Sequence, residues 1–164
     1  MLLSLTAEEI LEIAIEAERQ GAAFYERLAD SAQDERVKQE CRRLVTFERE
    51  HEKTFRHLLG QRDIQRALSS PQPGQSSDKY QQYLSALVDS NMLPDEEAAR
   101  RLAQDAASEA DAVNIALQME KNTILFYQEL QNLLGTQAGA LQTVLDEERS
   151  HVYELNELKA YLQN

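Results

Sequence analysis

Several residue types that carry specialised functions are scarce in this chain of 164 residues. The single cysteine, Cys41, excludes an internal disulfide and any four-cysteine iron or zinc site. Only three prolines and five glycines are present, and tryptophan is absent, a composition that favours uninterrupted helices. Acidic residues outnumber basic ones, and the resulting net charge of −12 argues against nucleic acid or an anionic membrane as the main partner.

Long hydrophobic runs are also missing. No apolar stretch approaches the roughly 20 residues needed to span a bilayer. The opening Met-Leu-Leu-Ser-Leu lacks the basic region that begins a signal peptide. We therefore expect a cytoplasmic protein without a membrane partner. The length suits one domain, residues 1–164, with a substantial hydrophobic core.

The apolar periodicity predicts two helical hairpins, residues 6–60 and 108–162, joined by a linker with short helices over 61–107. Thr6-Ala-Glu-Glu9 and Ser108-Glu-Ala-Asp111 are capping-box patterns that open the first helix of each hairpin. Gly60 and Gly135 are expected to end helices. The fold class is therefore all-α, a four-helix bundle with a long crossover between the second and third long helices.

All three prolines fall in the crossover, so the four long helices are unbroken. The Pro/Gly/Ser-rich segment 69–77 is expected to be mobile. Residues 79–90 should form a short helix. Pro94 and the acids after it should form the first turn of another helix, with negative charge at the positive end of its dipole.

The two hairpins repeat one sequence. Residues 13–28 resemble residues 115–130, and each copy contains one glutamate, Glu18 or Glu120. A Glu-x-x-His follows in each hairpin, at 48–51 and 148–151. One glutamate and one Glu-x-x-His from each of two hairpins form the ligand set of a two-metal carboxylate site in a bundle. The predicted ligands are Glu18, Glu48, His51, Glu120, Glu148 and His151.

Hairpin geometry supports this prediction independently. Residues three apart share a helix face, so each Glu-x-x-His can reach one point. Glu18 and Glu48 lie equally far from residue 33, inside the first predicted turn, and Glu120 and Glu148 from residue 134, beside the second. All four glutamates should therefore lie at one level of the bundle. The alternative is that these glutamates occupy solvated faces, but Glu18 is surrounded by small residues typical of a buried face.

Charge and ligand type indicate the metal. Four carboxylates and two neutral imidazoles balance two divalent ions, and this donor set suits iron or manganese better than a metal that seeks thiolates. Without metal, the buried carboxylates should repel one another, and some should be protonated. We expect Glu48 and Glu148 to bridge, Glu18 and Glu120 to be mainly terminal or bridging ligands, and each histidine to bind one ion. Sequence leaves open which carboxylates bridge.

Both tyrosines can be given a functional or a structural role, and the other residues of interest a structural one. Tyr25 and Tyr127 each follow a ligand glutamate by seven, so they are either hydrogen-bond partners or electron sources near the metals, or core aromatics. Cys41 is expected to be a buried, inert thiol. Gly21 should permit close helix packing. The remaining polar candidates are expected at the surface: Glu50, Glu52, His57 and Glu147.

These motifs are similar to the rubrerythrin branch of the ferritin-like diiron proteins over roughly residues 6–60 and 108–160. The resemblance implies a ferritin-like fold and two iron ions, with manganese or zinc as substitutes, at the six predicted ligands. It also implies ferrous iron that is oxidised by hydrogen peroxide or dioxygen. A homodimer or larger assembly is expected from the family and from the long amphipathic helices.

The sequence departs from this branch in two ways. Rubrerythrins proper carry a rubredoxin domain with two Cys-x-x-Cys pairs, which one cysteine rules out here, so an external electron donor such as a rubredoxin-type protein is needed. Thr123 also replaces an additional acid after the third-helix glutamate. Besides a diiron peroxidase or ferroxidase, two functions stay open: an iron storage or delivery protein, and a helical interaction protein with a structural metal site.

Overall fold

The computed structural model describes residues 6–70, 78–91, 93, 95–135 and 139–164, and it is all-α, as the sequence predicts. Among these residues, four long helices build a bundle: α1 Ala7–Ser31, α2 Glu35–Leu59, α6 Glu109–Leu134 and α7 Gly139–Leu162. The crossover contains α3 Arg62–Leu68, α4 Asp78–Asn91 and α5 Glu96–Gln104. The ferritin-like bundle with a long crossover is therefore confirmed.

The helix ends follow local chemistry. At Thr6 the capping box is complete, because Thr6 Oγ1 accepts from Glu9 N at 3.2 Å and Thr6 N donates to the Glu9 carboxylate at 2.7 Å. Ser108 also caps its helix, but its hydroxyl donates to the Asp111 carboxylate at 2.8 Å, so the expected second half of that box is replaced. Gly135 ends α6 with a φ of +56°, a conformation that favours glycine.

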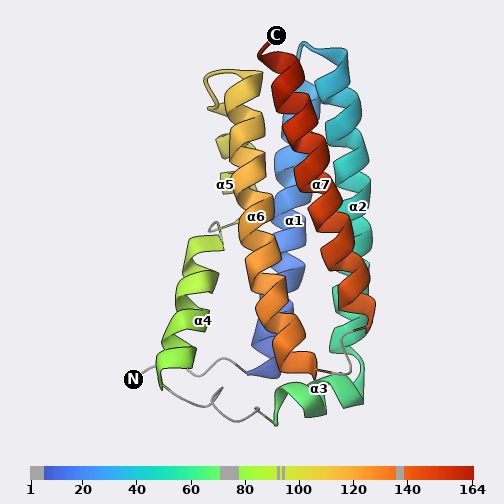
Figure 1. Ribbon diagram of the computed structural model, residues 1–164, viewed down its shortest axis with the longest axis vertical. Helices are drawn as coiled ribbons and strands as arrows, with labels where there is room; N and C mark the ends of the chain where they lie inside the picture. The colour runs from blue at the N-terminus through green and yellow to red at the C-terminus, as the bar shows by residue number, and fades with distance from the viewer. Residues whose placement is uncertain (1–5, 71–77, 92, 94, 136–138) are drawn as a thin grey trace.

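The four long helices run α1 up, α2 down, α6 down and α7 up, so the crossover must travel the length of the bundle (Figure 1). On its way, α4 packs against α6, and α5 packs against α1. Gln20, buried on α1, fixes the segment between α4 and α5, because its amide donates to Leu93 O at 2.8 Å and accepts from Leu93 N at 3.0 Å. The crossover is thereby attached to the outside of α1.

Predictions for the crossover have different outcomes. The short helix expected at 79–90 is confirmed as α4. The helix expected to begin at Pro94 begins at Glu96 instead, because the Asp95 carboxylate accepts from Ala98 N at 2.7 Å and caps it. Pro94 itself and residues 71–77 of the predicted mobile segment lie outside the described residues.

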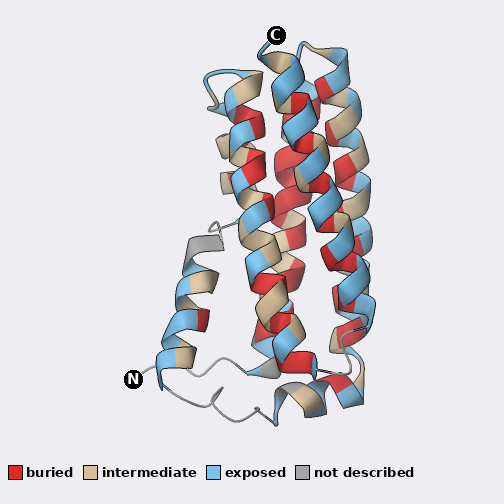
Figure 2. Ribbon diagram, viewed as in Figure 1, coloured by how far each residue is buried: buried red, intermediate tan, exposed pale blue. Residues whose placement is uncertain are grey.

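The buried faces of the long helices meet along the bundle axis (Figure 2). Two apolar clusters share this interior: one contains Phe24, Leu44 and Leu155, and the other contains Leu11, Phe55 and Leu145. The buried polar residues of the helices fall between these clusters in sequence. No helix among the described residues is both long enough and apolar enough to cross a bilayer.

Candidate metal centre

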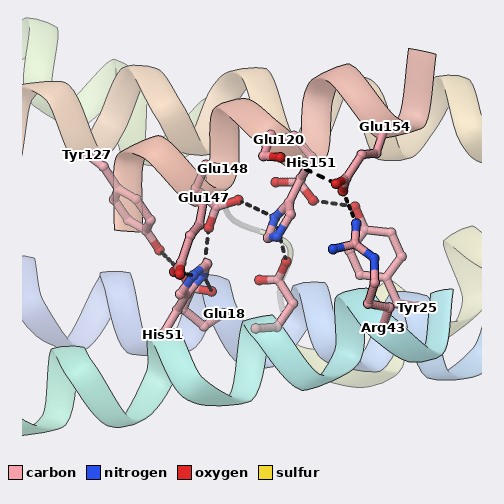
Figure 3. Close-up of polar contacts among 12 residues, drawn as sticks. Glu18, Tyr25, Arg43, His51, Glu120, Tyr127, Glu147, Glu148, His151 and Glu154 are labelled. Atoms are coloured by element: carbon pink, nitrogen blue, oxygen red, sulfur yellow. Dashed lines mark hydrogen bonds and ion pairs between the residues drawn. The ribbon is translucent and has the colours of Figure 1, made fainter. Parts of the chain in front are cut away.

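The six predicted ligands all lie in the interior, each at most 4% exposed. Each of the four long helices contributes: α1 and α6 one glutamate each, α2 and α7 one Glu-x-x-His each. The close-up view shows five of them pointing into the space between the helices (Figure 3): Glu18, His51, Glu120, Glu148 and His151. Burial of so many ionisable groups is unfavourable unless they are paired or coordinate a metal. The alternative that the glutamates occupy solvated faces is therefore wrong.

The six residues divide into two overlapping groups that can each hold a cation. In the first group, ligand atoms of Glu18, Glu48, His51 and Glu148 all lie within 4.8 Å of one another. In the second, the same holds for Glu48, Glu120, Glu148 and His151. Only Glu48 and Glu148 belong to both groups. Both residues are therefore placed where a carboxylate can contact two cations, as a bridging ligand must.

The histidines point their Nδ1 atoms at the carboxylates. His51 Nδ1 lies 2.8 Å from Glu148 Oε1 and 3.4 Å from Glu18 Oε2. His151 Nδ1 lies 3.0 Å from Glu148 Oε2 and 4.0 Å from Glu48 Oε1. One carboxylate, Glu148, is thus shared by both imidazoles.

Several buried ligand atoms lack a hydrogen-bond partner among the residues that the structure describes. They are Glu18 Oε2, Glu48 Oε1, His51 Nδ1, Glu148 Oε1 and His151 Nε2. His51 Nδ1 lies at ion-pair distance from Glu148, but the angle does not suit a hydrogen bond. Buried polar atoms are almost always satisfied. Unsatisfied carboxylate and imidazole atoms that converge on shared points fit a pair of divalent cations.

The electrostatics of the metal-free site agree with this interpretation. Burial, together with the neighbouring carboxylates, raises the pKa of Glu48 and of Glu120 well above the usual value. Burial would also raise the pKa of Glu148, but the hydrogen bond with His151 and the close contact with His51 lower it below its usual range. Burial lowers the pKa of His51, yet Glu148 and Glu18 outweigh this and raise it to about 11. Protons in these positions therefore compensate the charge that a metal would otherwise neutralise.

Tyr25 and Tyr127 extend the site by a reciprocal pair of hydrogen bonds. The Tyr25 hydroxyl on α1 donates to Glu120 on α6, and the Tyr127 hydroxyl on α6 donates to Glu18 on α1. Both rings are buried, and burial raises the pKa of each phenol well above its usual value. The interpretation as hydrogen-bond partners of the ligands is thus favoured, although each ring also packs in the core.

Gly21 has a more specific role than close helix packing. A Cβ atom there would lie 2.9 Å from Glu48 Oε2, so the missing side chain leaves the space that the Glu48 carboxylate occupies. Gly21, Tyr25, Met119 and Thr123 also line a cavity of about 20 Å³ beside Glu48, between α1 and α6. Such a cavity has room for about one water-sized molecule. The predicted ligands Glu18, Glu48 and Glu120 form part of its lining.

Glu147 is not the ordinary surface acid that the sequence suggests. Its carboxylate lies 2.8 Å from His51 Nε2, so it contacts the ligand histidine of the other hairpin. The internal repeat contains a signal for this position. Residue 147 corresponds to Phe47 in the other hairpin, and a large apolar residue there indicates a position that is not fully exposed. Cys41 is buried, and His57 and Glu50 are exposed, as expected. Glu52, also expected at the surface, is half-buried and pairs with Arg19 and Arg56.

The family model described as Rubrerythrin matches residues 9–159, which include all six predicted ligands. No curated protein and no solved structure matches the chain.

Proposed function

We propose that this chain, which belongs to the rubrerythrin family, is a non-haem diiron oxidoreductase. It would oxidise ferrous iron with hydrogen peroxide or dioxygen. The observation that carries this proposal is the pair of overlapping ligand groups with Glu48 and Glu148 in common. Two irons at this site would together supply the two electrons that reduction of an O–O bond requires. The donor set of carboxylates and imidazoles suits iron or manganese.

The surrounding residues have roles that follow from their contacts. Tyr25 and Tyr127 hold Glu120 and Glu18 in place through their hydroxyl protons. The cavity beside Gly21 and Thr123 admits a small oxidant to the face of Glu48. The apolar clusters above and below the site exclude bulk water.

Thr123 limits how the ligand set can change. In the described residues, the two cation-binding groups together contain the six predicted ligands, and no further acid joins them. Thr123 lines the cavity at the position where the family branch has an additional acid. We therefore propose that each iron keeps one protein ligand set in the ferrous and ferric states.

Reduction of the site needs a partner. The single cysteine excludes a rubredoxin-type iron site within these 164 residues. We propose that an external rubredoxin-type protein or another reductase supplies the electrons. Fully reduced protein should then react with peroxide in one rapid turnover and stop.

Anaerobic metal analysis followed by peroxide addition tests this function. We expect about two irons per chain, one fast optical change on adding peroxide, and sustained turnover only after a reductase is added. A chain in which Glu48 and Glu148 are both changed to glutamine should lose the metal and the optical change.

The same experiment separates the competing functions. Many irons per chain after aerobic loading would indicate storage or delivery instead. Two tightly held ions that do not react with peroxide or dioxygen would indicate a structural metal site. Either result would overturn the proposed oxidoreductase.

A further inference from the structure

The internal repeat is broken at one position beside the ligands. Glu48 and Glu148 are equivalent in the two hairpins, so the residues before them, Phe47 and Glu147, are equivalent too. One is an aromatic hydrocarbon and the other a carboxylate. Each contacts the ligand histidine of the opposite hairpin, so the two histidines have different surroundings.

His51 has a charged acceptor at its outer nitrogen. Glu147 reaches from α7 to His51 Nε2 at 2.8 Å, while Nδ1 of the same ring faces Glu18 and Glu148. The Glu147 side chain is 40% exposed, so its carboxylate keeps part of its hydration. With Nε2 as the donor to Glu147, the neutral imidazole that a metal requires would present its Nδ1 lone pair inside the site.

His151 lacks such an acceptor. The Phe47 ring lies with its centroid 5.0 Å from the imidazole centroid, at an interplanar angle of 66°. Within the part of the chain that the structure describes, buried His151 Nε2 has no hydrogen-bond partner. The Arg43 guanidinium lies 5.2 Å from the centroid of Phe47 on this side, and Glu154 pairs with it. The two ends of the site thus differ in acceptor and in nearby charge.

We propose that Glu147 is a positioning residue that makes the two metal positions unequal, with the ion at His51 bound more tightly than the ion at His151. A carboxylate on the outer N–H fixes the tautomer and orientation of an imidazole and raises its basicity as a ligand. A phenyl ring does none of these. This inference rests on the proposed two-metal function.

Anaerobic titration of the metal-free protein with cobalt(II), followed by visible absorption, tests the inference. Wild type should bind two ions in separate steps. Glu147→Gln should weaken the tighter step about 10- to 100-fold and leave the weaker step unchanged. The control is Glu50→Gln, which removes the same charge from an exposed residue that is next to His51 and pairs with Lys53. It should change neither step.

Two further backgrounds assign the effect to one histidine. In His151→Ala, adding Glu147→Gln should still lower the affinity for the remaining ion. In His51→Ala, the remaining ion should not respond to Glu147→Gln. Melting curves of the metal-free variants should coincide with those of their parents, since Glu147 is partly exposed and acts through the metal.

The failures are distinguishable. Absence of cobalt binding by wild type would refute the two-metal function and the inference with it. Two bound ions whose affinities respond equally to Glu147→Gln and Glu50→Gln would overturn the inference alone. So would an equal effect of Glu147→Gln in the two histidine backgrounds.

Discussion

Gly21→Ala should separate metal binding from fold stability, because the two respond in opposite directions. A glycine inside a helix is less favourable than alanine by about 1 kcal/mol, so metal-free protein should gain stability. In this state the end of the Glu48 side chain can turn away from the new methyl group. The melting temperature should rise by about 2–4 °C for a domain of this size.

With metal bound, the same methyl group meets a fixed ligand. The new Cβ would lie 2.9 Å from Glu48 Oε2, so the carboxylate must move by about 0.5 Å to reach the 3.4 Å of ordinary contact. Metal–ligand distances tolerate about 0.2 Å. Crowding of this kind costs about 1–3 kcal/mol, which corresponds to a loss of metal affinity of roughly 5-fold to 140-fold.

The assay is cobalt(II) titration together with melting of the metal-free protein. Gly139→Ala is the matched control, since a Cβ there has nothing within 4 Å, and it should leave metal affinity unchanged. Because Glu48 belongs to both ligand groups, Gly21→Ala should lower the affinity for both ions. Unchanged affinity for both ions would refute the placement of Glu48 as a shared ligand.

Three further predictions concern the metals, pH and assembly. His151→Ala should retain one ion, and His51→Ala/His151→Ala should retain neither by elemental analysis; full metal content in the double variant would contradict the assignment. Metal-free protein should melt at a lower temperature at pH 8 than at pH 5. Glu48 and Glu120 have pKa values above 4.5 and His51 has one near 11 instead of 6.5, so the folded state binds more protons than the unfolded state and loses stability as pH rises. The lowered pKa of Glu148 acts only below about pH 4.5 and leaves this window unchanged. Metal should therefore raise the melting temperature more at pH 8 than at pH 5, and equal melting of the two forms at pH 8 would exclude a buried carboxylate cluster. Light scattering at micromolar concentration should find a homodimer or larger assembly, and a monomer would exclude it.

The ligand set could be predicted from sequence because it depends on periodicity within helices and on the symmetry of hairpins. Glu18 and Glu48 lie at one level since their turn is centred on residue 33, and α1 ends at Ser31 while α2 starts at Glu35. The contacts of Glu147 and Gln20 were missed for the opposite reason. Each reaches an element that is remote in sequence, and its partner depends on how the hairpins and the crossover pack.

The reciprocal contacts between the hairpins give the chain the symmetry of a two-fold dimer. Tyr25 meets Glu120 as Tyr127 meets Glu18, so exchanging the hairpins reproduces the same pairs. Such mutual contacts define an isologous interface. Two copies of a gene for one hairpin would encode the complete set of ligands. Fusion of the copies then permits the halves to diverge, and Phe47 opposite Glu147 is a difference that an identical pair of hairpins could never acquire.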